Sequence, residues 1–326
     1  MAKQIKGVKG VDKLKAHHYL EYGLMRAVMG AAALLGLDRS SALGGWIGRR
    51  VGPLMPQHEV AHDNMKAGMP DLDEAALQLH LRDMWENFGR TMFEIPQLHK
   101  LLPYKDDSRT IVINGELVDE VLKEGKGALF IGAHCANWEA IAPCIRLRGY
   151  DLNGVYRAAN NALVNEWTKR IRGPNSFSSL APKGNSGAKI IVQHIRANIP
   201  VAMLIDQKMT EGLEVPFFGR TAKTPGAPAQ LSLRYDCPII PVQIRRTRGV
   251  HFEVTFHPRL AFQPTGNKSE DQIALATLRN KALEDFISEE PGQWMWMHNR
   301  WTASPRTIKR RQRRAERAAK RAKKNA

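Results

Sequence analysis

The chain has 326 residues, of which 43% are hydrophobic, and this is long enough for one large domain or two small ones; we favour one. The formal net charge is +17, but residues 306–326 (eleven Lys/Arg, one Glu) contribute +10 and residues 1–15 (five Lys, one Asp) contribute +4, which leaves +3 for the body. The basic ends therefore indicate anionic surfaces or acidic partners. The three cysteines are widely spaced and form no C-x-x-C pair, so they suggest neither a disulfide framework nor a zinc knuckle, and they fit a reducing compartment.

The first predicted element is an apolar segment at residues 24–37. It covers fourteen positions and contains Arg26, whereas a helix that spans a bilayer needs about 20 residues. Basic residues precede it as in a signal peptide, but no clear cleavage site of small residues follows. We expect the segment to lie in the membrane interface or to dip into it, and a buried core helix is the alternative.

A long helix and a series of strands come next. Residues 71–100 begin with the helix-start sequence D-L-D-E and contain no proline before Pro96. A further helix is predicted at residues 271–288, and after residue 301 the chain becomes a solvated basic tail. Apolar runs predict strands at residues 110–113, 128–131, 152–156, 201–205, 238–244 and 252–256. Helical patterns separate most of these strands, so we expect a single α/β domain with a largely parallel central sheet flanked by helices.

A histidine and a carboxylate lie five positions apart directly after the predicted strand at residues 128–131. On one continuous helix, His134 and Glu139 would point about 140° away from each other. On a strand-to-helix turn, His134 lies at the edge of the sheet and Glu139 in the first helical turn, where the helix dipole keeps it ionised. An ionised carboxylate can orient an imidazole that acts as a general base. From the spacing alone, a structural histidine and an ordinary first-turn acid explain the pair equally well.

This stretch resembles the H-x4-D/E motif of glycerolipid and lipid A acyltransferases, and further blocks of the resemblance occur in order. Between about residues 84 and 301 they read W-E-N-F-G-R, V-Y-R-x-x-N-N, V-P-F-F-G and P-G-Q-W-M-W-M-H-N-R. In this order they are similar to the late, lauroyl or myristoyl, acyltransferases of lipid A biosynthesis. The resemblance implies a single α/β domain with an N-terminal membrane-associated helix on the cytoplasmic face of the inner membrane. It also implies acyl carrier protein as the acyl donor, with no metal and no cofactor.

The resemblance further implies roles for polar residues after the histidine. In the family, an arginine that follows the Y-R-x-x-N-N block is thought to act near the catalytic histidine, and Arg170 is the matching position. Arg157, Asn160 and Asn161 lie in the block itself and are candidates for substrate binding. Arginine side chains are suitable donors for a lipid phosphate or a developing oxyanion. A solvated surface position is the alternative for each arginine.

Asp206 directly follows the predicted strand at residues 201–205, at the carboxyl end where α/β sheets bind ligands. It is therefore a second candidate partner for His134, and a cap of the next turn is its alternative role. Phe217 and Phe218 offer rigid apolar walls for an acyl chain or for the membrane interface, although core packing explains them as well.

Two other motifs are weaker. Residues 58–62 match H-E-x-x-H, which on a helix presents two histidines to zinc. Only three positions of this motif are specified and no third histidine follows as in metzincins, so we expect no metal site. Cys135 is disfavoured as a nucleophile because no second base is placed for it.

Together these features predict a membrane-associated O-acyltransferase. We expect His134 to take the proton of an acceptor hydroxyl with Glu139 or Asp206 as its partner, while Arg170 and loop amides hold the oxyanion. The expected acceptor is a lipid A precursor, and a lysophospholipid or other glycerolipid is the alternative.

Three regions follow from this interpretation. We expect residues 1–52 to form the basic N-terminus and membrane-associated helices, residues 53–305 the acyltransferase domain, and residues 306–326 the basic tail. Nucleic acid is not an expected partner, because this tail carries no aromatic residues for base stacking.

Overall fold

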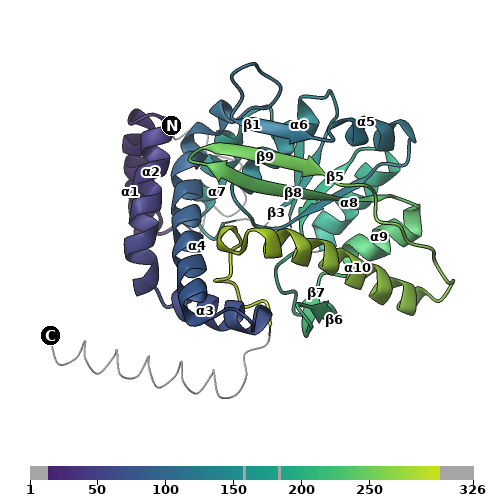
Figure 1. Ribbon diagram of the computed structural model, residues 1–326. Coiled ribbons are helices and arrows are strands. Elements are labelled where there is room, and N and C mark those ends of the chain that lie inside the picture. Colours follow the sequence, from purple (N-terminus) through teal and green to yellow (C-terminus); the bar gives the residue numbers. More distant parts are fainter. Residues whose placement is uncertain (1–13, 157–158, 183–184, 302–326) are drawn as a thin grey trace.

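A seven-stranded sheet forms the centre of the computed structural model, which describes residues 14–156, 159–182 and 185–301 (Figure 1). Within these residues the strand order is β1-β9-β8-β2-β5-β3-β4, and all neighbours run parallel except β8 and β9. The strands of the sheet are β1 (Thr110–Ile113), β2 (Leu129–Gly132), β3 (Asn153–Tyr156), β4 (Ser179–Pro182), β5 (Val201–Leu204), β8 (Ile239–Arg248) and β9 (His251–Phe256). The predicted α/β domain with a largely parallel sheet is confirmed.

Helices surround this sheet, and α1, α2 and α4 stand side by side at one end of it (Figure 1). The α-helices of the described residues are α1 (Ala16–Leu34), α2 (Leu37–Val51), α3 (Gln57–Gly68), α4 (Glu74–Glu94), α5 (Glu116–Lys123), α6 (Ile141–Arg146), α7 (Ala162–Arg172), α8 (Asn185–Arg196), α9 (Ala227–Tyr235) and α10 (Lys268–Glu289). Short 3-10 helices are η3 (Gly52–Leu54), η4 (Ile95–Lys100), η5 (Trp138–Ala140) and η6 (Pro291–Gln293).

Local sequence signals explain where the long helix α4 begins and why all residues of β2 are buried. Asp73 caps α4, because its Oδ1 accepts a hydrogen bond from the backbone N–H of Ala76 at 2.7 Å. The helix predicted at residues 71–100 is shorter in the structure, because α4 ends at Glu94 and the 3-10 helix η4 follows next to Pro96. All four residues of β2 are buried, which is the burial expected of a central strand covered on both faces.

The apolar segment at residues 24–37 is divided between two helices. Helix α1 ends at Leu34, Gly36 has a φ of 77°, and α2 begins at Leu37. Among the described residues, no helix is both long enough and apolar enough to cross a bilayer. Helix α2 packs closely on α4, where a Cβ on Gly44 would lie 2.4 Å from the carbonyl oxygen of Gly89. Contact with the membrane interface stays a prediction for this segment.

The sequence does not predict the edge strand β4 or the hairpin of β6 (Leu213–Phe217) and β7 (Arg220–Thr224). The hairpin turn is Phe218-Gly219, and both residues have positive φ, 49° and 65°. Such two-residue turns usually carry Asn-Gly or Asp-Gly. Because phenylalanine occupies the first position here, the sequence does not show the usual hairpin pattern.

Candidate active site

His134 and Asp206 meet because the strands before them are neighbours. Strands β2 and β5 pair in parallel with Gly132 opposite Leu204, and each candidate residue lies two positions beyond its strand. The His134 Nδ1 atom lies 2.7 Å from Asp206 Oδ1, and the backbone N–H of His134 donates to Oδ2 at 3.0 Å. Of the two predicted partners, the structure therefore places Asp206 against the imidazole.

The Asp206 carboxylate is buried, at 2% exposure, and its oxygens are held by hydrogen-bond donors. The Trp294 indole N–H donates to Oδ2 at 2.7 Å, in addition to the two bonds from His134. Burial alone would raise the pKa of Asp206, but the charge and the N–H groups of His134 together with the Trp294 indole outweigh it and lower the pKa to about 2. An ionised Asp206 keeps the imidazole proton on Nδ1, so the Nε2 lone pair is available as a base.

This lowered pKa predicts an acid-sensitive contribution to stability. Because the pKa of Asp206 is lower in the folded chain than its ordinary value of 3.8, the stabilisation is complete above about pH 4 and is lost as the pH falls toward 2. Between pH 5 and pH 3, the free energy of unfolding should fall by roughly 1–2 kcal/mol more in the wild type than in Asp206→Asn. Urea denaturation at the two pH values measures this difference, and parallel losses in both proteins would contradict it.

Two polar side chains that the sequence analysis did not assign line the outer side of the imidazole. The Gln207 Nε2 atom lies 3.5 Å from His134 Nε2 and 3.2 Å from His298 Nε2. Trp138 stands edge-on to the His134 ring at 5.1 Å between ring centroids. The signals were present in the sequence, because Gln207 follows Asp206 at the strand end and His298 lies in the W-M-H-N-R block.

Glu139 pairs with an arginine of α7 and not with the imidazole. Arg172 donates through Nε to Glu139 Oε2 at 2.7 Å and through Nη2 to Oε1 at 2.6 Å. Burial opposes the charge on Arg172, but the Glu139 carboxylate prevails and raises the pKa of the guanidinium. The predicted position, Arg170, is exposed. Two helical positions differ by about 200°, so Arg170 and Arg172 point in opposite directions.

The asparagines of the Y-R-x-x-N-N block have different surroundings. Asn161 is buried and caps α7, because its Oδ1 accepts from the N–H of Leu163 at 3.0 Å. Its Nδ2 donates to α1, to the His18 carbonyl at 2.9 Å and to Glu21 at 3.0 Å. This predicted substrate-binding residue therefore holds α7 to the N-terminal helix. Asn160 is exposed, and Arg157 lies outside the described residues.

Phe217 and Phe218 take part in an aromatic cluster behind the Asp206 side of the site. Phe217 is fully buried, with its ring centroid 5.7 Å from that of Trp294 and 5.8 Å from that of Trp301. Phe218 is partly buried and packs on Trp296 at 5.8 Å. Core packing, the alternative for these residues, is what the structure shows for Phe217.

The predicted loop amides are already engaged in hydrogen bonds. The N–H of His134 donates to Asp206, that of Cys135 to the Ala133 carbonyl at 2.8 Å, and that of Ala136 to the Gln293 carbonyl at 3.1 Å. These three amides have partners within the protein, and the expected role of loop amides toward an oxyanion stays a prediction.

The Cys135 thiol lies in the same loop and is buried. Burial and the charge of Asp206 raise its pKa well above the ordinary value, so the sulfur stays protonated. A protonated, enclosed thiol is a poor nucleophile.

The H-E-x-x-H stretch lies on α3, and its two histidines make separate polar contacts. The Nδ1 of His58 accepts from the Trp85 indole N–H at 3.0 Å, and His62 lies 3.6 Å from a Glu74 oxygen. Within the described ranges, no group of three or more His, Cys, Asp or Glu side chains is arranged to hold a metal ion.

Comparisons with known proteins identify the family of the chain. The model of the bacterial lipid A biosynthesis acyltransferase family matches residues 11–303. A lipid A biosynthesis acyltransferase of Haemophilus influenzae is 24% identical over 260 residues, which cover 78% of each chain. A lipid A biosynthesis lauroyltransferase of Escherichia coli is 22% identical over 252 residues, 77% of this chain and 80% of that protein. The chain therefore belongs to the bacterial lipid A biosynthesis acyltransferase family.

Proposed function

We propose that this acyltransferase moves a fatty acyl chain from acyl carrier protein to a hydroxyl of a lipid A precursor, with His134 as the general base. The observation that carries the proposal is the pairing of His134 Nδ1 with the buried Asp206 carboxylate at 2.7 Å. This contact orients the ring, selects the tautomer and leaves Nε2 directed toward Gln207. A base of this kind activates a hydroxyl without a covalent enzyme intermediate.

The reaction then proceeds in two steps, the formation and the collapse of a tetrahedral intermediate. His134 Nε2 accepts the proton of the acceptor hydroxyl while its oxygen attacks the thioester carbonyl, which forms a C–O bond and a tetrahedral oxyanion. The oxyanion collapses and the C–S bond breaks, and the imidazolium returns the proton to the leaving sulfur, which departs as a thiol. Asp206 stabilises the imidazolium between the two steps, because its carboxylate already contacts Nδ1.

Side chains are the better candidates for holding the oxyanion, since the first three loop amides are engaged. The Gln207 amide lies next to Nε2, where the attacking oxygen must arrive, and His298 lies beside it. We infer that these two groups contact the reacting atoms. Arg172, held by Glu139 at the other side of the loop, replaces Arg170 as the arginine nearest to the motif.

We infer a location at the cytoplasmic face of the inner membrane, and the outer surface of α1 and α2 supports the part of this inference that concerns contact with a membrane. Leu20, Leu24 and Val28 are four residues apart, so they share one face of α1, and all three are exposed. Exposed apolar side chains continue along α2 and η3 at Leu43, Trp46, Val51 and Leu54. A surface of this kind enters the interfacial region of a bilayer without crossing it. The same membrane holds the phosphorylated lipid acceptor of the proposed reaction.

Binding to anionic vesicles should have two separable components. Deletion of residues 306–326 should remove most of the salt-sensitive component, because each Lys/Arg near the surface contributes at most about 1 kcal/mol and its field decays within roughly 8 Å. The double variant Leu20→Ser/Leu24→Ser should weaken the component that persists in high salt, while Ile273→Ser, a single change of the same kind at an exposed position of α10, should not. Co-sedimentation at two salt concentrations measures both. Unchanged binding and salt response after the tail is deleted would exclude the tail as an anchor.

Mass spectrometry of lipid A tests the proposed function. A strain without this chain should produce lipid A that lacks one secondary acyl chain, and the wild-type chain but not His134→Ala should restore it. Unchanged lipid A together with altered phospholipids would favour a glycerolipid acceptor. With purified protein, transfer from acyl carrier protein but not from acyl coenzyme A would identify the donor.

A further inference from the structure

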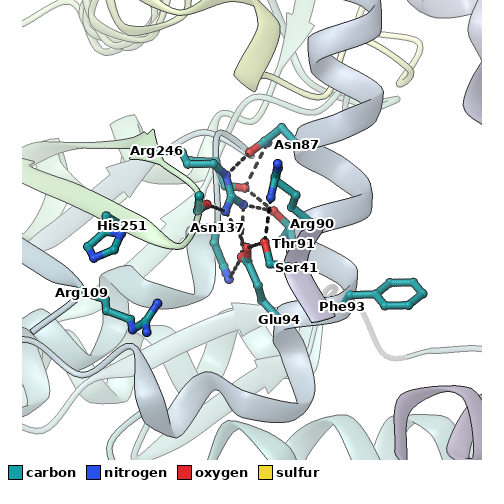
Figure 2. A network of polar contacts seen from close by, with 12 residues as sticks. Ser41, Asn87, Arg90, Thr91, Phe93, Glu94, Arg109, Asn137, Arg246 and His251 are labelled. Atoms are coloured by element: carbon teal, nitrogen blue, oxygen red, sulfur yellow. Dashed lines mark hydrogen bonds and ion pairs between the residues drawn. The ribbon is translucent and has the colours of Figure 1, made fainter. Parts of the chain in front are cut away.

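A buried network of polar side chains lies behind the loop that carries His134, and no step of the proposed reaction uses it. At its centre, the Glu94 carboxylate of α4 pairs with the Arg246 guanidinium of β8 at 2.5 and 3.1 Å (Figure 2). Their side chains are 0% and 7% exposed, and Ser41 of α2 donates to the same carboxylate at 2.7 Å. A buried ion pair loses hydration that its attraction barely offsets, so stability alone is a poor reason for this pair.

The network holds the two residues that end the loop. The Asn137 amide donates to Glu94 Oε2 at 2.8 Å (Figure 2). The Thr91 hydroxyl donates to the Ala136 carbonyl at 2.9 Å. Arg246 in turn donates to the Thr91 hydroxyl at 3.1 Å. Ala136 has a φ of 45°, a left-handed conformation that a residue with a Cβ adopts only when its surroundings impose it. The contacts from α4 supply that constraint two residues after His134.

Arg246 also contacts Gln293, in the segment of residues 293–295 that packs against the loop. The Gln293 side chain accepts from the Arg246 N–H at 2.7 Å and donates to the Arg246 carbonyl at 2.9 Å. Its backbone carbonyl accepts from the N–H of Ala136, and the N–H of Met295 donates to the His134 carbonyl at 3.2 Å. The residue between these two, Trp294, donates to Asp206. Arg246 is thus connected to the loop by two routes, through Thr91 and through Gln293.

We propose that the cluster of Glu94, Arg246, Thr91 and Asn137 is a positioning device that sets the geometry of the His134 and Asp206 pair. The cluster touches neither the imidazole ring nor the Asp206 carboxylate in any contact described above, so it acts through the loop backbone. A kinetic role for this geometry rests on the proposed function, in which His134 is the base. The placement of the imidazole can be tested separately, in protein without substrate.

Thr91 offers the cleanest test, because its replacement leaves no buried charge without a partner. Thr91→Val keeps the shape of the fully buried side chain and removes the hydroxyl that links Arg246 to Ala136. We expect kcat for acyl transfer to fall about tenfold or more with KM changed less than about twofold, since small displacements of a base are costly in rate. Thr91→Ser, which keeps the hydroxyl, should recover most of the rate. If the valine variant does not fold, Thr91→Ala makes the same deletion.

The same substitution at another helical threonine separates positioning from a general effect of replacing threonine by valine. Thr277→Val on α10, at a partly exposed position, removes a hydroxyl that donates within its own helix, to the Ile273 carbonyl at 2.9 Å. This control should leave kcat and KM unchanged. A rate loss in the control as large as that of Thr91→Val would overturn the positioning role.

The NMR signal of the His134 Nδ1 proton in substrate-free protein gives a readout independent of activity. Because this proton lies in the contact with Asp206, its chemical shift should change in Thr91→Val and stay at the wild-type position in Thr91→Ser. A wild-type chemical shift in the valine variant would overturn the proposal, whatever the rate. A changed chemical shift, in a protein that transfers no acyl chain even as wild type, would support positioning and reject the proposed function.

Discussion

Replacement of His134 by alanine is expected to lower the rate of acyl transfer by about 10²- to 10⁴-fold, the contribution that a positioned general base typically makes. The residue lies at the end of the buried strand β2, and its ring is the one that pairs with Asp206. Initial rates with acyl carrier protein as the donor measure the effect, and circular dichroism checks that the variant is folded.

A second histidine serves as the matched control for this substitution. His62 lies in the H-E-x-x-H stretch of α3 and contacts Glu74, away from the proposed site. His62→Ala should retain wild-type turnover, and a chelator should have no effect on either protein. Wild-type activity in His134→Ala would reject the mechanism, and chelator inhibition that added zinc reverses would restore residues 58–62 as a metal site.

The largest effect beyond the histidine is expected for Asp206→Asn, with a loss of roughly 10²-fold or more in kcat. The amide has no charge to stabilise the imidazolium. Its NH₂ group can also donate to Nδ1, which places the imidazole proton on Nε2 and removes the lone pair that the base needs. Because the loss falls on the charged transition state, KM should change much less than kcat.

Glu139→Gln is the matched comparison, since it removes the same charge from the other acidic residue. Glu139 pairs with Arg172, so the change should cost about tenfold or less in kcat, by loosening the arginine and not the base. A larger loss in Glu139→Gln than in Asp206→Asn would mean that Glu139 is the charge partner during the reaction. Steady-state kinetics of the two variants with the same donor decide between them.

The choice between these acids illustrates a limit of reading along the chain. His134 and Glu139 are five positions apart, so local spacing favours them as a pair. Asp206 is 72 positions away, and it reaches the imidazole only because β2 and β5 are adjacent and parallel. Strand order depends on which crossovers pack best, and no local pattern of apolar residues contains that information.

The N-terminal region shows a similar limit at the level of helices. The apolar run at residues 24–37 indicates one segment, but Gly36 ends the first helix and the glycines of α2 bring the second against α4. Through this contact Ser41 reaches Glu94, so the region expected to form the membrane-associated helices also joins the polar network behind the loop.

By itself the sequence determined the α/β class, most of the central strands, the start of α4 and the placement of His134 and Asp206 at strand ends. These features follow from buried apolar runs, capping residues and the termini of strands, which are encoded within a few positions of one another. Only the tertiary structure decided that Asp206 is the partner of His134, that Arg172 and not Arg170 holds Glu139, and that Glu94 and Arg246 support the loop. Each of these contacts joins side chains from different elements, so it exists only once the strand order and the helix packing have brought distant parts of the chain together.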